Sequence, residues 1–164
     1  MKNLVVYYSW MGNTEAVAKE IHTLVGGDLK KLEEVKERKS GAGFMGAAFS
    51  ALVGMKSRLK PMDFSLKGYD NVFLGLQVWA SRSTPAINAF ISKADLKGKK
   101  VYLLITKADS KVPQKVIDSV TKRIENRGGK VVDSFSVTTK MKNVITPEAI
   151  KESASEWIKK LNIV

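Results

Sequence analysis

Short apolar runs alternate with helical patterns along this chain, and that alternation is the feature that most limits its fold. Residues 4–8, 72–76 and 101–105 are mostly apolar runs that predict buried strands. Apolar side chains spaced three and four residues apart predict helices between them. In chain order we predict strands at 4–8, 29–35, 72–76, 101–105 and 130–137, and helices at 14–25, 85–94, 112–126 and 146–161.

The order of these elements predicts the architecture. Continuous apolar strands are typical of parallel sheets covered on both faces, and right-handed crossovers then give a three-layer, doubly wound α/β fold. The strand at 29–35 is more charged and suits the edge of this five-stranded parallel sheet. Neither repeats nor a low-complexity linker interrupt the 164 residues, so we expect one domain over 1–164. Ligands of such folds bind beyond the carboxyl ends of the strands.

The chain contains no cysteine. This excludes iron–sulfur clusters, thiolate zinc sites, disulfides and cysteine catalysis, and we expect no metal site. Met1 is followed almost directly by an apolar strand, without the pattern of a signal peptide. The uncharged stretch Ser40 to Met55 is too short and too rich in Gly and Ala to span a membrane. We therefore expect a cytoplasmic protein.

The net charge is +12, and most of the excess lies in the second half of the chain. Such a charge concerns partners and solubility rather than fold. Nucleic acid, anionic membrane and acidic proteins are all compatible with it. We do not expect a nucleic-acid partner, because the sequence has no recognition motif and no aromatic stripe on a basic strand.

The segment between the first strand and the first helix is a candidate phosphate site. A helix N-terminus offers unpaired N–H groups and the positive end of the helix dipole. No Lys or Arg occurs from Asn3 to Ala18, so backbone amides and the hydroxyls of Ser9 and Thr14 would bind the phosphate. The alternative is an ordinary helix cap at Asn13 or Thr14. The candidate residues are Ser9, Trp10, Met11, Gly12, Asn13 and Thr14.

Two further loops follow strands and should reach the same sheet edge. One runs from Gly75 to Pro85 and the other from Thr106 to Ser110. Trp79 lies in the first of these loops and Trp10 in the candidate phosphate segment, where an aromatic side chain is a natural stacking partner for a planar ring. The alternative for both is a packing role.

These three segments resemble the flavin-binding loops of flavodoxins. Tyr8-Ser9-x-x-Gly12-Asn13-Thr14 is similar to the family's FMN phosphate loop, and the other two occupy the positions of its flavin-contacting loops. The resemblance implies a short-chain flavodoxin-like fold with strand order 2-1-3-4-5 and one bound FMN. Beyond the phosphate loop, it implies cofactor-binding roles for Gln77, Val78, Trp79, Ala80, Ser81, Arg82, Thr106, Lys107, Ala108, Asp109 and Ser110.

The implied function is electron transfer between redox partners, with no catalytic side chain. The alternative is an FMN-dependent NAD(P)H or quinone reductase on the same fold. Electron-carrier flavodoxins are typically acidic, whereas this chain is basic. We therefore predict a basic rim around the flavin edge that docks an acidic partner. Its residues are Arg82, Lys107, Lys111, Lys115, Lys140 and Lys142.

Other patterns have simpler interpretations. Gly41 to Gly46 spells GxGxxG, but a charged segment precedes it instead of the buried strand that a dinucleotide site requires. We predict a flexible connection with a short helix at 47–55, which packs on the sheet or on a second subunit. A homodimer through 41–58 is one candidate assembly, and a membrane-surface role is another interpretation of this segment.

Two single residues have structural interpretations. His22 suits a surface or cap position, and Trp157 suits the core.

Overall fold

The structure is a computed structural model of the chain and describes residues 1–36, 46, 49, 53–140 and 143–163. Its parallel strands lie in the order β2-β1-β3-β5-β6, and β4 pairs antiparallel with β3. This confirms the predicted order, since β5 and β6 are the fourth and fifth predicted strands. The strands are β1 (Asn3–Tyr7), β2 (Asp28–Lys31), β3 (Asn71–Trp79), β4 (Arg82–Ser83), β5 (Lys100–Lys107) and β6 (Lys130–Thr138).

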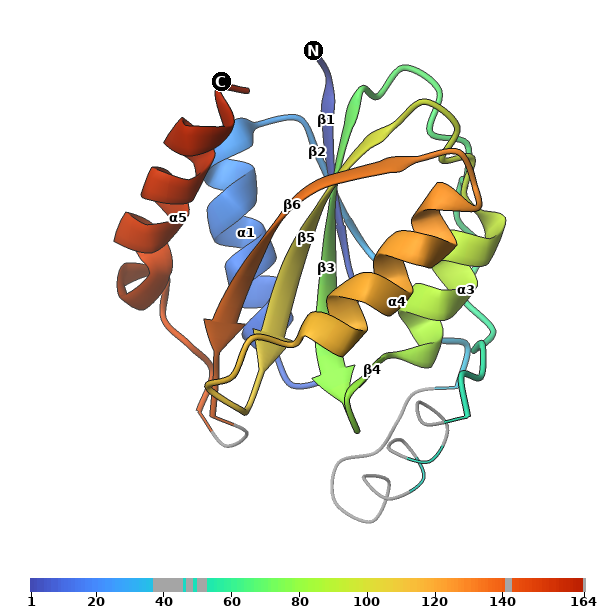
Figure 1. Cartoon of the computed structure of the whole chain (residues 1–164), viewed down its shortest axis with the longest axis horizontal. Coiled ribbons are helices and arrows are strands. Elements are labelled where there is room, and N and C mark those ends of the chain that lie inside the picture. Colours follow the sequence, from blue (N-terminus) through green and yellow to red (C-terminus); the bar gives the residue numbers. More distant parts are fainter. Residues whose placement is uncertain (37–45, 47–48, 50–52, 141–142, 164) are drawn as a thin grey trace.

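Helices cover both faces of the sheet (Figure 1), as predicted. The pair α1 (Asn13–Val25) and α5 (Pro147–Leu161) packs on one face, where Ile21 and Trp157 share a core with Phe73 of β3. The pair α3 (Pro85–Lys93) and α4 (Gln114–Glu125) covers the other. The alternation of side chains along the strands supplies both cores.

The second predicted strand is shorter than expected. β2 is an edge strand whose pairing with β1 ends at Lys31 opposite Tyr7, where β1 itself ends. The chain then leaves the sheet, and Glu34 forms an isolated antiparallel bridge with Leu59. Leu32, which helped to suggest a strand over 29–35, is buried without continuing the pairing of β2 with β1.

The predictions for two single residues agree with the structure. Trp157 is buried, stacks on Phe135 and donates its indole N–H to Asp133 Oδ2 at 3.1 Å. His22 lies in the last turns of α1, with Nε2 3.0 Å from the Gly27 carbonyl oxygen. Within the described part of the chain, no helix combines the length and the apolar character needed to cross a membrane. Residues 41–45 of the GxGxxG pattern, and much of 47–55, lie outside the described residues.

Candidate functional site

The three predicted loops meet at the carboxyl edge of the sheet, where the structure links them by side chains. The backbone N–H of Trp10 donates to Gln77 Oε1 at 3.1 Å. The hydroxyls of Thr14 and Thr106 lie 2.7 Å apart and are buried. These two contacts join the loop before α1 to the end of β3, and the first turn of α1 to the end of β5.

The loop before α1 is shaped by a glycine. Gly12 is the N-cap of α1, with φ of 91° and no side-chain cap, so the interpretation of Asn13 or Thr14 as the cap is wrong. A Cβ at Gly12 would lie 3.0 Å from Val144 Cγ2, and the left-handed φ also favours glycine. The Gly12 N–H donates to Ser9 Oγ at 3.1 Å. The loop thus presents the helix N-terminus together with a serine hydroxyl.

The segment that follows β6 folds back over this loop. The Asn13 side chain donates to the Lys140 carbonyl at 3.2 Å and accepts from the Ile145 N–H at 2.8 Å. Both polar ends of the Asn13 side chain are therefore bonded to the segment before α5. Sequence reasoning missed this clamp, because it joins residues more than 120 positions apart in the chain.

The loop after β3 is a tight hairpin rather than an open connection. Trp79 pairs with Arg82, and the two residues between them, Ala80 and Ser81, have φ of 46° and 58°. Left-handed φ at both central positions is the type I′ geometry, which usually selects Asn or Gly. Such strain costs on the order of 1 kcal/mol for each residue and is concentrated in proteins at functional sites.

A cavity of about 720 Å³ opens between this hairpin, the end of β5 and the start of α4. Volumes of roughly 300–1,000 Å³ are typical of small-molecule sites. Its walls mix apolar, polar and cationic side chains. They are formed by Val78, Ser81, Lys107, Ala108, Asp109, Lys111, Val112, Pro113, Gln114, Lys115 and Val116.

Lys107 is buried at this cavity, with 6% of its surface exposed. Its ammonium group donates to the Asp109 carbonyl at 2.6 Å and to Thr138 Oγ1 at 3.0 Å. The sequence predicted Lys107 on an exposed rim, and that placement is wrong because these two acceptors draw the ammonium group inward. Lys142, also predicted for the rim, lies outside the described residues.

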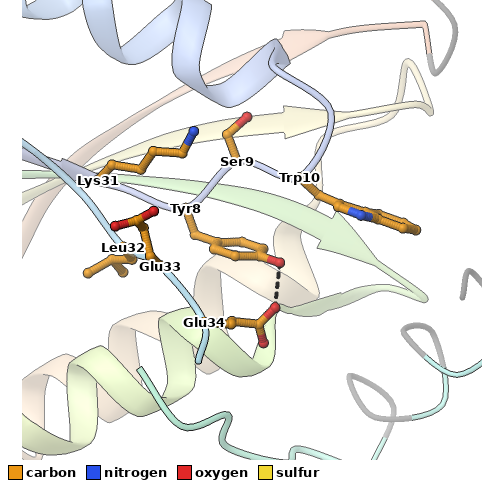
Figure 2. A pocket seen from close by; sticks show the side chains of 7 residues that line it. All are labelled: Tyr8, Ser9, Trp10, Lys31, Leu32, Glu33 and Glu34. Carbon is orange, nitrogen blue, oxygen red and sulfur yellow. Dashed lines mark hydrogen bonds between the residues drawn. The ribbon is translucent and has the colours of Figure 1, made fainter. Parts of the chain in front are cut away.

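A second, smaller cavity of about 200 Å³ lies beside the ends of β1 and β2 (Figure 2). Here the Tyr8 hydroxyl donates to Glu34 Oε2 at 2.7 Å, and both side chains are buried. Lys31, another lining residue, bonds Glu15 at 2.8 Å, as does Lys19. These two lysines hold the pKa of Glu15 below its ordinary value.

The predicted aromatic residues form a cluster. Trp79 is 8% exposed and makes edge-to-face contacts with Trp10 and Tyr8, at centroid distances of 5.4 and 6.1 Å. The larger cavity is lined by its neighbours Val78 and Ser81 instead. Stacking of either tryptophan on a ligand ring stays a prediction.

The fold and this edge define a doubly wound α/β protein whose candidate ligand site lies beyond the strand ends. The family model for flavodoxin matches residues 2–147, and the chain belongs to the flavodoxin family. No curated protein matches the chain significantly.

Solved structures share the fold at low sequence identity. A protein from Bacteroides uniformis, proposed to be a flavoprotein, is 21% identical with a TM-score of 0.74, covering 96% of this chain and 97% of that one. A similar protein from Bacteroides eggerthii has the same identity and TM-score, with 99% of each chain covered. A flavoprotein from Lactobacillus acidophilus, solved in complex with FMN, is 16% identical with a TM-score of 0.62, covering 82% and 92%.

Proposed function

We propose that this protein binds one FMN at the carboxyl edge and carries electrons between redox partners. The observation that carries the proposal is the juxtaposition of two features in a flavodoxin-family chain. One is a helix N-terminus with a glycine N-cap and a serine hydroxyl. The other is the 720 Å³ cavity lined by Val78 and Lys107, whose preceding residues, Gln77 and Thr106, are hydrogen-bonded to Trp10 and Thr14. An anionic phosphate suits the first, and a planar ring of mixed polarity suits the second.

The phosphate would bind at the loop from Ser9 to Thr14. Its ligands would be the amides at the start of α1 and the Ser9 hydroxyl, with the helix dipole adding attraction of about 0.3–1 kcal/mol. The Thr14 hydroxyl lies 2.7 Å from that of Thr106, so we assign it a second role in positioning the loop against β5. The donor set fits a phosphate ester that is recognised without a lysine or arginine.

The flavin ring would lie between the hairpin at 77–82 and the loop at 106–110. Val78 and Ala108 would supply apolar contacts, and Ser81 and Asp109 polar ones. Bound FMN supplies one- or two-electron redox chemistry at this edge. The chain's own residues hold the ring in place, keep water from its buried face and set the local charge.

A comparison of FMN with riboflavin tests the phosphate site. Gly12→Ala should weaken FMN about tenfold, or 1.4 kcal/mol, and leave riboflavin affinity unchanged. Gly68→Ala is the matched control, because Gly68 also has a left-handed φ, of +85°, but open space around its Cβ. Both variants suffer backbone strain, and only one adjoins the proposed site. Equal losses for the two ligands in Gly12→Ala would contradict the assignment.

Tryptophan fluorescence tests the ring position. FMN should quench the wild-type emission, and Trp79→Phe and Trp10→Phe should each remove part of that quenching. Trp157 of α5, stacked on Phe135 of β6, gives the emission that remains in the double variant. Quenching of unchanged amplitude in the double variant would place the ring elsewhere.

Anaerobic mixing with NADPH distinguishes an electron carrier from a reductase. A carrier keeps its visible flavin absorbance until a partner or dithionite is added. Rapid bleaching by NADPH alone would assign the reductase function instead.

A further inference from the structure

A group of exposed cationic and apolar side chains lies at the carboxyl edge, on the segments next to the larger cavity and the phosphate loop. We name it the basic edge. It combines residues of the hairpin, the start of α4 and the segment after β6. Its members are Arg82, Lys111, Val112, Lys115, Lys140 and Val144.

Hydrogen bonds bring these segments together. Lys107 joins the end of β5 to β6 through Thr138, and the Thr139 N–H donates to the Lys107 carbonyl at 2.8 Å. Asn13 then ties the Lys140 backbone to the phosphate loop. The hairpin residue Ser81 lines the same cavity as Lys111 and Lys115. Lys111, Val112 and Lys115 therefore line the larger cavity, and Arg82 follows the lining residue Ser81. Lys140 and Val144 lie in the segment that contacts the phosphate loop.

Within the part of the chain that the structure describes, the cations of the basic edge have no acidic partner. Among the described residues, no ion pair within 4 Å involves Arg82, Lys111, Lys115 or Lys140, whereas lysines near β2 pair with Glu15, Asp28 and Glu33. The one acid in the loop at 107–111 is Asp109, whose Oδ1 accepts the Lys111 backbone N–H at 2.9 Å. The edge therefore presents net positive charge to solvent.

Two valines of the basic edge are also exposed. Val112 is 68% exposed and Val144 is 53% exposed. Protein interfaces combine apolar contacts with a charged rim that steers the partner. A surface meant only for solubility has no need of an exposed apolar residue next to a cation, as Val112 is next to Lys111.

We propose that the basic edge is the docking surface for an acidic redox protein, which approaches the cofactor at the larger cavity. This inference rests on the proposed function, because it assigns the partner of the same site. The lysines raise the rate of encounter with an acidic protein, and the valines form the contact once it has docked.

Electron transfer to two probe proteins tests the proposal. The FMN-loaded protein is reduced with dithionite, freed of excess reductant and mixed with acidic cytochrome b5 or basic cytochrome c. Rates are normalised to bound FMN. The rate with cytochrome b5 should fall about tenfold or more as salt rises, and the rate with cytochrome c should not fall.

Matched variants locate the effect. Lys111→Glu/Lys115→Glu should slow cytochrome b5 about tenfold at low salt and flatten its salt dependence. Lys159→Glu/Lys160→Glu, at the far end of α5, makes the same change of charge and should have a much smaller effect. Val112→Ser should slow the reaction at every salt concentration, because apolar contact is not screened.

The outcomes separate this proposal from the proposed function. Equal slowing by both charge variants would mean that only net charge matters, and it would overturn the docking surface. A salt dependence that stays at the wild-type value in both variants would overturn it as well. A rate with cytochrome c that falls with salt as steeply as the rate with cytochrome b5 would have the same consequence. A protein that binds no FMN would instead overturn the proposed function.

Discussion

Two cavities formed by described residues at the carboxyl edge, one beside β1 and β2 and one beside β5 and α4, have differently arranged charges. In the smaller cavity, Glu34 is bonded to Tyr8, and Lys31 is paired with Glu15. In the larger cavity, the buried ammonium of Lys107 is bonded to a carbonyl and a hydroxyl, without a carboxylate. The first region satisfies its charges internally, and the second leaves positive charge available to a ligand or partner.

The difference separates structural polar groups from candidate functional ones. Buried groups that already have partners stabilise the fold but have little to offer an incoming molecule. The larger cavity also has the strained hairpin at Ala80 and Ser81, which the smaller one lacks. Strain and uncompensated charge therefore coincide on one side of the edge.

The largest expected effect concerns the smaller cavity, where the buried polar groups already have hydrogen-bond partners. Tyr8→Phe should lower the free energy of unfolding by about 2 kcal/mol, because the buried Glu34 carboxyl loses a hydrogen-bond donor. Tyr69→Phe is the control, since Tyr69 donates to Asp28, which is more exposed, at 2.6 Å. Urea unfolding of the two variants measures the difference. Equal losses would mean that burial does not distinguish the two bonds.

The strained hairpin should respond in the opposite direction. Ala80→Gly and Ser81→Gly should each stabilise the protein by about 0.5–1 kcal/mol, because glycine adopts left-handed φ without the Cβ penalty. Thermal unfolding measures the gain, and FMN titration shows whether the looser hairpin binds less tightly. A fall in Tm in both variants would show that the hairpin is not strained.

The smallest expected effect is a pH dependence of the free energy of unfolding, which comes from Glu15 beside the smaller cavity. The pKa of Glu15 is lowered by hydrogen bonds from Lys19 and Lys31, so its contribution to stability is present above the unfolded value near 4.5 and is lost as pH falls through the lower folded pKa. The lysines are largely exposed, which limits the contribution to less than about 1 kcal/mol. In Glu15→Gln, the free energy of unfolding should therefore fall less between pH 7 and pH 3 than it does in the wild type. An unchanged difference would contradict this role.

Local patterns predicted the buried strands and the loops that follow them, and the resemblance to flavodoxins supplied the strand order that the structure confirms. Buried strands such as 101–105 and the glycine-containing loop after Tyr8 are visible as runs of residue types. The strand at 29–35 was predicted too long, because the end of pairing at Lys31 depends on where its neighbour β1 stops.

The remaining features depend on distant contacts. The Asn13 clamp and the burial of Lys107 arise from residues on other elements, to which no local pattern points. The β4 hairpin places Ala80 and Ser81 where sequence preference expects Asn or Gly, so propensity argued against it.

Backbone amide NMR spectra recorded during an FMN titration test the proposed site most directly. We predict saturation at one FMN per chain, with shifts at residues 10–14, 78–82 and 107–111. Inorganic phosphate alone should shift the first group only, and residues 31–34 beside the smaller cavity should change little. Shifts centred on 31–34, or no saturable shifts at all, would contradict the assignment of FMN to the larger cavity and the phosphate loop.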